Sequence, residues 1–308
     1  MSESGVEQFA ELASGMRICF RDNGAASDPA ILLVAGLGED LTFWGDSFVD
    51  SLVAHGYRVI TMDNRDVGQS SFATTPPPAV WRQALARPRV DGYTLADMAG
   101  DCIGVLDHLG IEQAHLVGRS MGGMIAQTVA ATVPERVLSL TSIYSTTGAA
   151  RIGQPAKSTI WKLVFASEAK TRTDAVRAHL RITRHIVGTA YPMDDAEEAA
   201  IAARGWDRSA GDQAAGVARQ IQAIQLSGDR TEQLRTITAP TLVIHGDRDL
   251  MVAPSGGEAT AAAIPSAQQV VIPGMGHHIP EALVDPVTRY IAGHADRVGA
   301  GDHQVEIS

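Results

Sequence analysis

The sequence predicts an α/β fold, in which a mostly parallel, doubly wound sheet is interrupted by a helical insertion. Short apolar runs typical of buried strands alternate with segments of helical periodicity along most of the chain. The alternation stops between about Thr146 and Arg235, where amphipathic stretches rich in Ala, Arg and Gln take over. With 308 residues, the chain can bury a large core without a disulfide or a metal to stabilise it.

Apolar runs identify the expected strands. The first, residues 31–34, follows Asp28-Pro29 and stops at Gly36, as expected for a strand that is buried on both faces. Pro240 marks the return to the sheet after the insertion, because proline suits the position just before a strand. The other expected strands are residues 57–62, 115–117, 137–143, 241–244 and 269–272.

One helix has a clear beginning and end in the sequence. Thr94 and Asp97 have the spacing of a capping box, and Gly110 stops the helical pattern. The apolar residues between them recur at helical spacing: Leu95, Met98, Cys102, Val105, Leu106 and Leu109. This helix should lead directly into the strand at 115–117.

These patterns predict the organisation of the chain. We expect a core domain formed by residues 1–145 and 236–298, with a helical cap inserted at residues 146–235. Residues 299–308 are polar and glycine-rich and lack a period, so we expect a flexible tail.

Composition narrows the class of protein. The chain has 25 basic and 35 acidic residues, a net charge of −10, which disfavours binding to nucleic-acid phosphates. Cys19 and Cys102 lack the spacing of a zinc site or a disulfide framework.

Glu3, Glu7 and Glu11 occupy the region where a signal peptide needs a basic start, and no apolar run is long enough to span a membrane. We expect a cytoplasmic protein without a membrane span.

The segment from Gly118 to Gly122 carries the sharpest chemical signal. It has the pattern G-x-S-x-G between an expected strand and a helical stretch at 124–133. The glycines permit a turn too tight for side chains, and the strained backbone projects the Ser120 hydroxyl above the sheet. The hydroxyl then lies at a helix N-terminus, which favours developing negative charge. These features predict a nucleophilic serine.

A serine nucleophile needs a base, and the base needs a group that fixes its tautomer. Both candidates follow in the loops after the next two expected strands. Asp249 is the preferred acid, although Asp247 is an alternative whose other role is a hydrogen bond within the loop. His277 is the preferred base, and His278 is expected to line the pocket beside it.

These three segments, in this order, resemble the α/β-hydrolase family over nearly the whole chain. In that family the acid commonly lies in a G-x-x-D loop, which matches residues 246–249, and the base in a G-x-G-H loop, which matches residues 274–277. The resemblance implies an α/β-hydrolase fold with a Ser120, Asp249 and His277 triad.

Residues 63–70, 118–122 and 272–277 resemble more narrowly the aclacinomycin methylesterase branch of bacterial hydrolases. Asp66 stands where many family members have glycine, a departure that this branch shares. Arg119 replaces the His or Leu common beside the nucleophile. It could bind an acidic group of a substrate, or support the neighbouring structure.

An oxyanion formed at Ser120 requires two hydrogen-bond donors. Met121 supplies one backbone N–H by its position after the nucleophile, and the resemblance assigns the other to Leu37.

The glycines at 36 and 38 also suggest a dinucleotide loop, but Leu41 replaces its third glycine. A nicotinamide oxidoreductase is therefore a weak alternative, and we expect neither a cofactor nor a metal.

The predicted function is a serine hydrolase that cleaves carboxylic esters of small or medium apolar substrates through an acyl-enzyme. The same triad also serves thioesterases, lactonases, C–C bond hydrolases and perhydrolases. Halide-releasing and epoxide-opening relatives use aspartate where this chain has Ser120. A non-catalytic ligand-binding protein of this fold is the alternative from another class.

The cap is expected to roof the active site and to shape its pocket. Its large side chains are candidates for an apolar lining, together with His278 of the core, although each could instead pack within the cap. The predicted partner is a small-molecule ester, and the sequence leaves monomer and homodimer open. The candidate lining residues from the cap are Trp161, Phe165, Met193 and Trp206.

Overall fold

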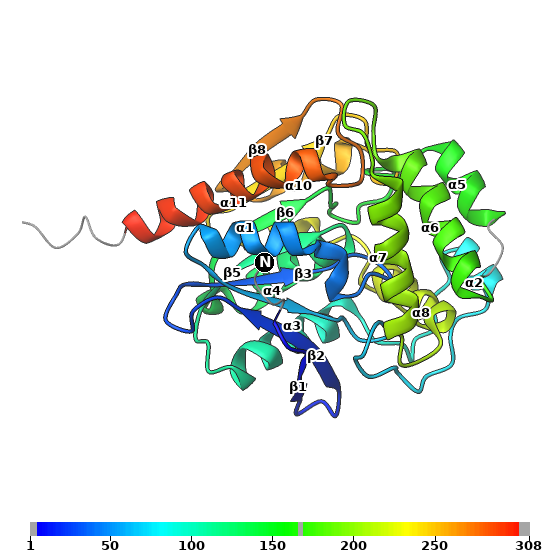
Figure 1. Ribbon diagram of the computed structural model, residues 1–308, viewed down its shortest axis with the longest axis horizontal. Coiled ribbons are helices and arrows are strands. Elements are labelled where there is room, and N and C mark those ends of the chain that lie inside the picture. Colours follow the sequence, from blue (N-terminus) through cyan, green and yellow to red (C-terminus); the bar gives the residue numbers. More distant parts are fainter. Residues whose placement is uncertain (1–4, 166–168, 302–308) are drawn as a thin grey trace, which may run out of the picture.

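The computed structural model describes residues 5–165 and 169–301 (Figure 1). These residues form an eight-stranded sheet in the order β1-β2-β4-β3-β5-β6-β7-β8. Neighbours from β4 to β8 are parallel, whereas β2 joins β4 and β1 antiparallel. The predicted α/β fold is confirmed. The strands are β1 (Gln8–Glu11), β2 (Arg17–Asn23), β3 (Ala30–Val34), β4 (Arg58–Met62), β5 (Ala114–Arg119), β6 (Val137–Ile143), β7 (Thr241–Gly246) and β8 (Ala267–Ile272).

Helices connect the strands and cover both faces of the sheet (Figure 1). Outside the stretch between β6 and β7 they are η1 (Leu41–Trp44), α1 (Asp46–Ala54), α2 (Val80–Ala84), α3 (Leu95–His108), α4 (Met121–Thr132), η2 (Pro134–Arg136), α10 (Ser255–Ala263) and α11 (Glu281–Gly301). Between β6 and β7 lie α5 (Lys157–Val164), α6 (Arg172–Ile186), α7 (Asp195–Arg208), α8 (Gln213–Ser227) and α9 (Thr231–Leu234). We refer to α5–α9 as the inserted helices.

The core lies on both faces of the central strands. Along β3, Ile31 and Leu33 pack with α1 and α11, whereas Leu32 and Val34 pack with α3 and α4. Successive side chains of a strand point to opposite faces, so a continuous apolar run indicates burial on both. This is why the central strands were recognisable in the sequence.

The hairpin of β1 and β2 was not predicted. In β2 the buried apolar run is only Ile18, Cys19 and Phe20, flanked by Arg17 and Arg21. β1 is a short strand at the edge of the sheet. Neither segment is long enough to be distinguished from a loop by its hydrophobic pattern.

The capping box of α3 forms as its sequence predicts. The N–H of Asp97 donates to the Thr94 hydroxyl, and the N–H of Thr94 donates to the Asp97 carboxylate at 2.7 Å. Gly110, with φ +67°, follows the end of the helix in a conformation that favours glycine. Local chemistry alone therefore fixes both ends of this helix.

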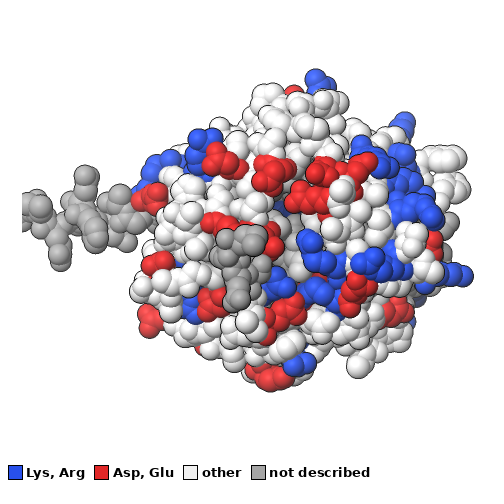
Figure 2. All heavy atoms as spheres, in the orientation of Figure 1, with Lys and Arg blue, Asp and Glu red and all other residues white. Residues whose placement is uncertain are grey.

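Figure 1 shows the inserted helices α5 to α8 gathered at one end of the sheet. On the face drawn in Figure 2, Lys and Arg side chains concentrate at that same end, so the charge on this face is unevenly distributed. The predicted tail at 299–308 overlaps the end of α11, which reaches Gly301, and residues 302–308 lie outside the described residues.

Helix α8 is anchored to the core through Asp66. The Arg219 guanidinium donates from Nε and Nη2 to the two carboxylate oxygens, at 2.8 and 2.6 Å. The Tyr93 hydroxyl and the Ala73 N–H donate to the same carboxylate at 2.7 and 2.8 Å. Asp66 has φ +70°, which accounts for the glycine that many family members carry at this position.

Replacing Arg219 with Met should destabilise the protein strongly. The Asp66 carboxylate would remain buried without its cation, and breaking a buried pair in this way costs about 3–5 kcal/mol. Urea unfolding would measure the loss. Arg235→Met is the control, because Arg235 forms an exposed pair with Glu232 worth less than about 1 kcal/mol. Equal losses in both variants would contradict the anchoring role of Arg219.

Candidate active site

Ser120 lies on the turn between β5 and α4, where the backbone is tightly constrained. Its φ of +53° is in the left-handed region that non-glycine residues rarely adopt. A Cβ atom on Gly118 would lie 2.2 Å from the carbonyl oxygen of Gly122, and one on Gly122 would lie 2.0 Å from that of Val34. Only glycine fits at these two positions, so the turn that exposes Ser120 requires both.

The loops after β7 and β8 bring Asp249 and His277 to this serine. His277 Nε2 lies 2.9 Å from Ser120 Oγ, and His277 Nδ1 lies 2.7 Å from Asp249 Oδ2. Asp247 is placed differently, because its Oδ1 accepts a hydrogen bond from the Gly274 N–H. Asp247 thus joins the two loops, and the three preferred residues form one continuous hydrogen-bonded line.

Asp249 is buried among groups that favour its ionised form. Its Oδ1 accepts hydrogen bonds from the N–H groups of Met251 and Val252, both at 2.8 Å. Burial raises the pKa of the Asp249 carboxyl, but the charge of His277 and hydrogen bonds from His245 and His277 outweigh burial and lower the pKa to about 2. A carboxylate of this kind can hold an imidazole in one orientation and stabilise its protonated form.

Met121 follows Ser120 in the chain, and the turn that holds Leu37 approaches the serine. Met121 is the first residue of α4, so its N–H belongs to the helix turn that has no partner within the helix. Leu37 lies in the turn after β3, and a Cβ atom on the preceding Gly36 would be 3.4 Å from the Ser120 Cβ. Two different segments, the start of α4 and the turn after β3, therefore meet at the nucleophile.

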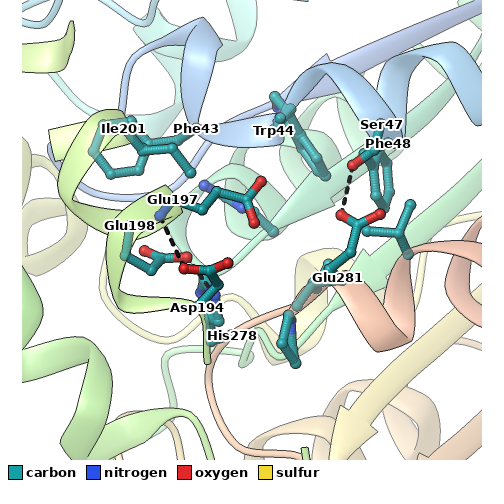
Figure 3. A pocket seen from close by; sticks show the side chains of 15 residues that line it. Phe43, Trp44, Ser47, Phe48, Asp194, Glu197, Glu198, Ile201, His278 and Glu281 are labelled. Carbon is teal, nitrogen blue, oxygen red and sulfur yellow. Dashed lines mark hydrogen bonds and ion pairs between the residues drawn. The ribbon is translucent and has the colours of Figure 1, made fainter. Parts of the chain in front are cut away.

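His278 lines a small pocket between α7 and α1 (Figure 3). Its Nε2 lies 2.9 Å from Glu198 Oε1, and the other oxygen of Glu198 is 2.6 Å from His179 Nε2. Burial raises the pKa of the Glu198 carboxyl, but the hydrogen bonds with His179 and His278 and their charges lower the pKa to about 2. Glu198 thus links two inserted helices to the loop that carries His277.

A larger cleft, of about 1190 Å³, opens among the inserted helices and reaches Leu37. Trp206, one of the candidate lining residues, lies along this cleft. Trp161 and Phe165 instead stack on each other, with ring centroids 4.3 Å apart, and are 68% and 65% exposed. Met193 is half-buried outside this lining. Helical spacing alone could not show which faces of these helices turn toward the cleft.

Sequence reasoning left the role of Arg119 open and missed Tyr144. The Arg119 side chain is buried, donates from Nε to Glu39 at 2.8 Å, and lies 4.9 Å from the centre of the Trp44 ring. It therefore belongs to a supporting network. The Tyr144 ring packs against the His277 ring at 4.4 Å between centroids. No sequence motif marks either contact, since both arise between distant segments.

Within residues 5–165 and 169–301, no group of three or more His, Cys, Asp or Glu side chains is arranged to hold a metal ion. In the same residues, no helix combines the length and the apolar character needed to cross a bilayer.

The sheet is mostly parallel and presents a serine on a strand–helix turn, and loops after later strands carry the acid and the histidine. This arrangement defines the class of α/β hydrolases. The chain belongs to this family: the alpha/beta hydrolase fold matches residues 29–281. The resemblance that the sequence motifs indicate is thereby confirmed.

The chain is similar to several hydrolases over most of its length. The rhodomycin D methylesterase DnrP of Streptomyces peucetius is 29% identical over 294 residues, which cover 88% of this chain and 92% of the relative. A 2-hydroxy-6-oxononadienedioate/2-hydroxy-6-oxononatrienedioate hydrolase of Cupriavidus pinatubonensis is 29% identical over 286 residues, 90% of this chain and 91% of the relative. The crystal structure of an enol-lactonase from Burkholderia xenovorans LB400 matches with a TM-score of 0.71 and 27% identity, over 94% of this chain and 100% of that one.

Replacing Glu198 with Gln should remove a pH-dependent part of the stability. The Glu198 pKa falls from an ordinary 4.5 to about 2 on folding, so its contribution is full above pH 4.5 and is lost as the pH falls toward 2. We expect the variant to be less stable at pH 7 by about 3 kcal/mol, with the difference vanishing near pH 2. Urea unfolding across this pH range measures it.

Glu197→Gln is the matched control for this experiment. Glu197 is the neighbouring residue of α7, and partial burial and the charges of Glu281 and Glu198 raise the pKa of its carboxyl. A raised carboxyl pKa opposes folding at neutral pH, so this substitution should cost no stability at pH 7. A pH-independent loss in Glu198→Gln would contradict the assigned role of Glu198.

Proposed function

We propose that this protein is a serine hydrolase that cleaves carboxylic esters through an acyl-enzyme. The observation that carries the proposal is the continuous hydrogen-bonded line from Ser120 Oγ through His277 to Asp249, with spacings of 2.9 and 2.7 Å. A serine hydroxyl is weakly nucleophilic at neutral pH, and this arrangement supplies both the base and the group that orients the base.

In the first half of the proposed reaction, Ser120 Oγ attacks the carbonyl carbon of the ester. His277 Nε2 accepts the hydroxyl proton as the new C–O bond forms, and the Asp249 carboxylate stabilises the resulting imidazolium. The carbonyl oxygen becomes an oxyanion, which accepts hydrogen bonds from the N–H groups of Leu37 and Met121. The tetrahedral intermediate then expels the alcohol, which takes the proton from His277.

The second half repeats these steps with water. His277 takes a proton from water as the water oxygen attacks the acyl carbon of the acyl-enzyme, and the oxyanion forms again at the same two donors. Collapse of this intermediate breaks the bond to Ser120 Oγ, which recovers its proton from His277. The products are the free carboxylic acid and the regenerated enzyme.

The proposed substrates are neutral esters of small or medium apolar acids or alcohols. Similarity to a methylesterase supports an ester, and the cleft that reaches Leu37 has room for a medium-sized group. The similarity to a C–C bond hydrolase and an enol-lactonase keeps those two reactions as alternatives on the same triad. We further propose that the inserted helices act as a cap and that the enzyme is cytoplasmic, the latter because Cys19 and Cys102 are free, buried thiols.

Replacing Ser120 with Ala should lower kcat for p-nitrophenyl butyrate by about 10⁴- to 10⁶-fold, because the nucleophile is lost. Release of p-nitrophenol measures the rate, and a fluorophosphonate should label the wild-type protein but not this variant. The matched control is Ser139→Ala. Ser139 Oγ lies 2.8 Å from His115 Nδ1 in a second Ser–His pair, buried between β5 and β6.

Activity should be retained in Ser139→Ala, because this pair is buried away from the nucleophile. Burial also lowers the pKa of His115 to about 4, which makes it a weak base. Esterolysis that survives in Ser120→Ala would overturn the site assignment. A wild-type protein that hydrolyses no ester, thioester or lactone and resists labelling would favour a non-catalytic ligand-binding protein.

A further inference from the structure

The turn after β3 is held in place by side chains from two directions. It spans Gly36 to Glu39 and is closed by a hydrogen bond from the Glu39 N–H to the Gly36 carbonyl oxygen at 3.3 Å. Gly38 has φ +70°, which suits the third position of such a turn. Leu37, the proposed oxyanion donor, lies between two glycines whose N–H groups both have side-chain partners.

The first partner is Glu39, on the side of the nucleophile. Its Oε2 accepts a hydrogen bond from the Gly36 N–H at 2.7 Å and another from Arg119 Nε at 2.8 Å. Arg119 is buried and immediately precedes Ser120 in the chain. One carboxylate oxygen therefore ties the turn to the residue next to the nucleophile.

The second partner is Gln220, which comes from inserted helix α8. Its side chain is fully buried, its Oε1 accepts a hydrogen bond from the Gly38 N–H at 2.8 Å, and its Nε2 donates to the Arg65 carbonyl oxygen at 2.9 Å. Because one end of the amide faces a donor and the other an acceptor, its orientation is fixed. The Arg219–Asp66 pair, one residue away on α8, anchors this part of the helix to the core.

We propose that Gln220 and Glu39 are positioning residues for the oxyanion hole. They engage the N–H groups on either side of Leu37 and so direct the Leu37 N–H toward the oxygen of the tetrahedral intermediate. This inference rests on the proposed function. Its consequence is that an inserted helix, and not the core alone, sets the geometry of transition-state binding.

The decisive experiment compares Gln220→Met with Gln222→Met. Gln222 is a matched control, since it is a buried glutamine on the same helix whose Oε1 accepts a backbone hydrogen bond from the Arg89 N–H at 2.9 Å, outside the 36–39 turn. Removing an oxyanion donor costs about 100- to 1000-fold in kcat, and a misplaced donor should cost about 10- to 100-fold. We expect that loss in Gln220→Met, with KM changed by less than about threefold.

A second readout separates positioning from a general structural effect. Affinity for an alkyl boronic acid, whose serine adduct mimics the tetrahedral intermediate, should fall in Gln220→Met by a factor similar to kcat. Protection of the Gly38 amide from hydrogen exchange should also fall. Gln222→Met should show neither change, even where urea unfolding shows that the two variants lose equal stability.

The Glu39 side of the turn provides an independent test if Gln220→Met folds poorly. Glu39→Gln keeps a side-chain carbonyl that can accept from the Gly36 N–H, whereas Glu39→Ala does not. We expect Glu39→Gln to retain most of the kcat and boronic acid affinity that Glu39→Ala loses.

The outcomes distinguish this inference from the proposed function. If the wild-type protein hydrolyses esters through Ser120 but Gln220→Met matches Gln222→Met in kcat and boronic acid affinity, the inference is wrong and the proposed function stands. A loss confined to KM also contradicts it. If the wild-type protein shows no serine-dependent hydrolysis, the proposed function fails and this inference fails with it.

Discussion

The site depends on a close approach between backbone segments. These segments lie so near to each other that no side chain would fit between them. At Gly122, α4 approaches the end of β3 so closely that an added Cβ would lie 2.0 Å from the Val34 carbonyl oxygen. This contact holds the start of α4 against the sheet, and with it the strained backbone of Ser120. It also brings the turn after β3 beside the serine. The nucleophile and both proposed oxyanion donors are therefore consequences of one packing constraint.

Several buried polar contacts join the inserted helices to this rigid centre. Arg219 of α8 pairs with Asp66, Glu198 of α7 pairs with His278, and Arg208 of α7 pairs with carboxylates of the core. Ion pairs and hydrogen bonds are directional, whereas apolar contacts are not, so these contacts fix the orientation of the helices relative to the core. Apolar contacts dominate within the core itself. Aliphatic side chains fill most of the core around the sheet, which is consistent with an aromatic content of only 5%.

Several elements could be predicted because their causes are local. Continuous apolar runs marked the central strands, and Thr94 with Asp97 marked the start of α3. The β1–β2 hairpin escaped prediction because its apolar run is short and flanked by arginines. Trp161 and Phe165 were expected near the substrate, yet they stack on each other at the surface. Helical spacing gives the period of a helix but not the face that it turns toward a cleft.

The sequence by itself determined the family, the parallel sheet and the order of Ser120, Asp249 and His277, because a tight glycine turn and a buried strand each need particular residues at adjacent positions. Only the tertiary structure decided which polar side chains support the site. Gly38 meets Gln220 across 182 positions of the chain, and Arg119 meets Glu39 across 80. Such contacts follow no spacing rule, since folding alone brings their partners together.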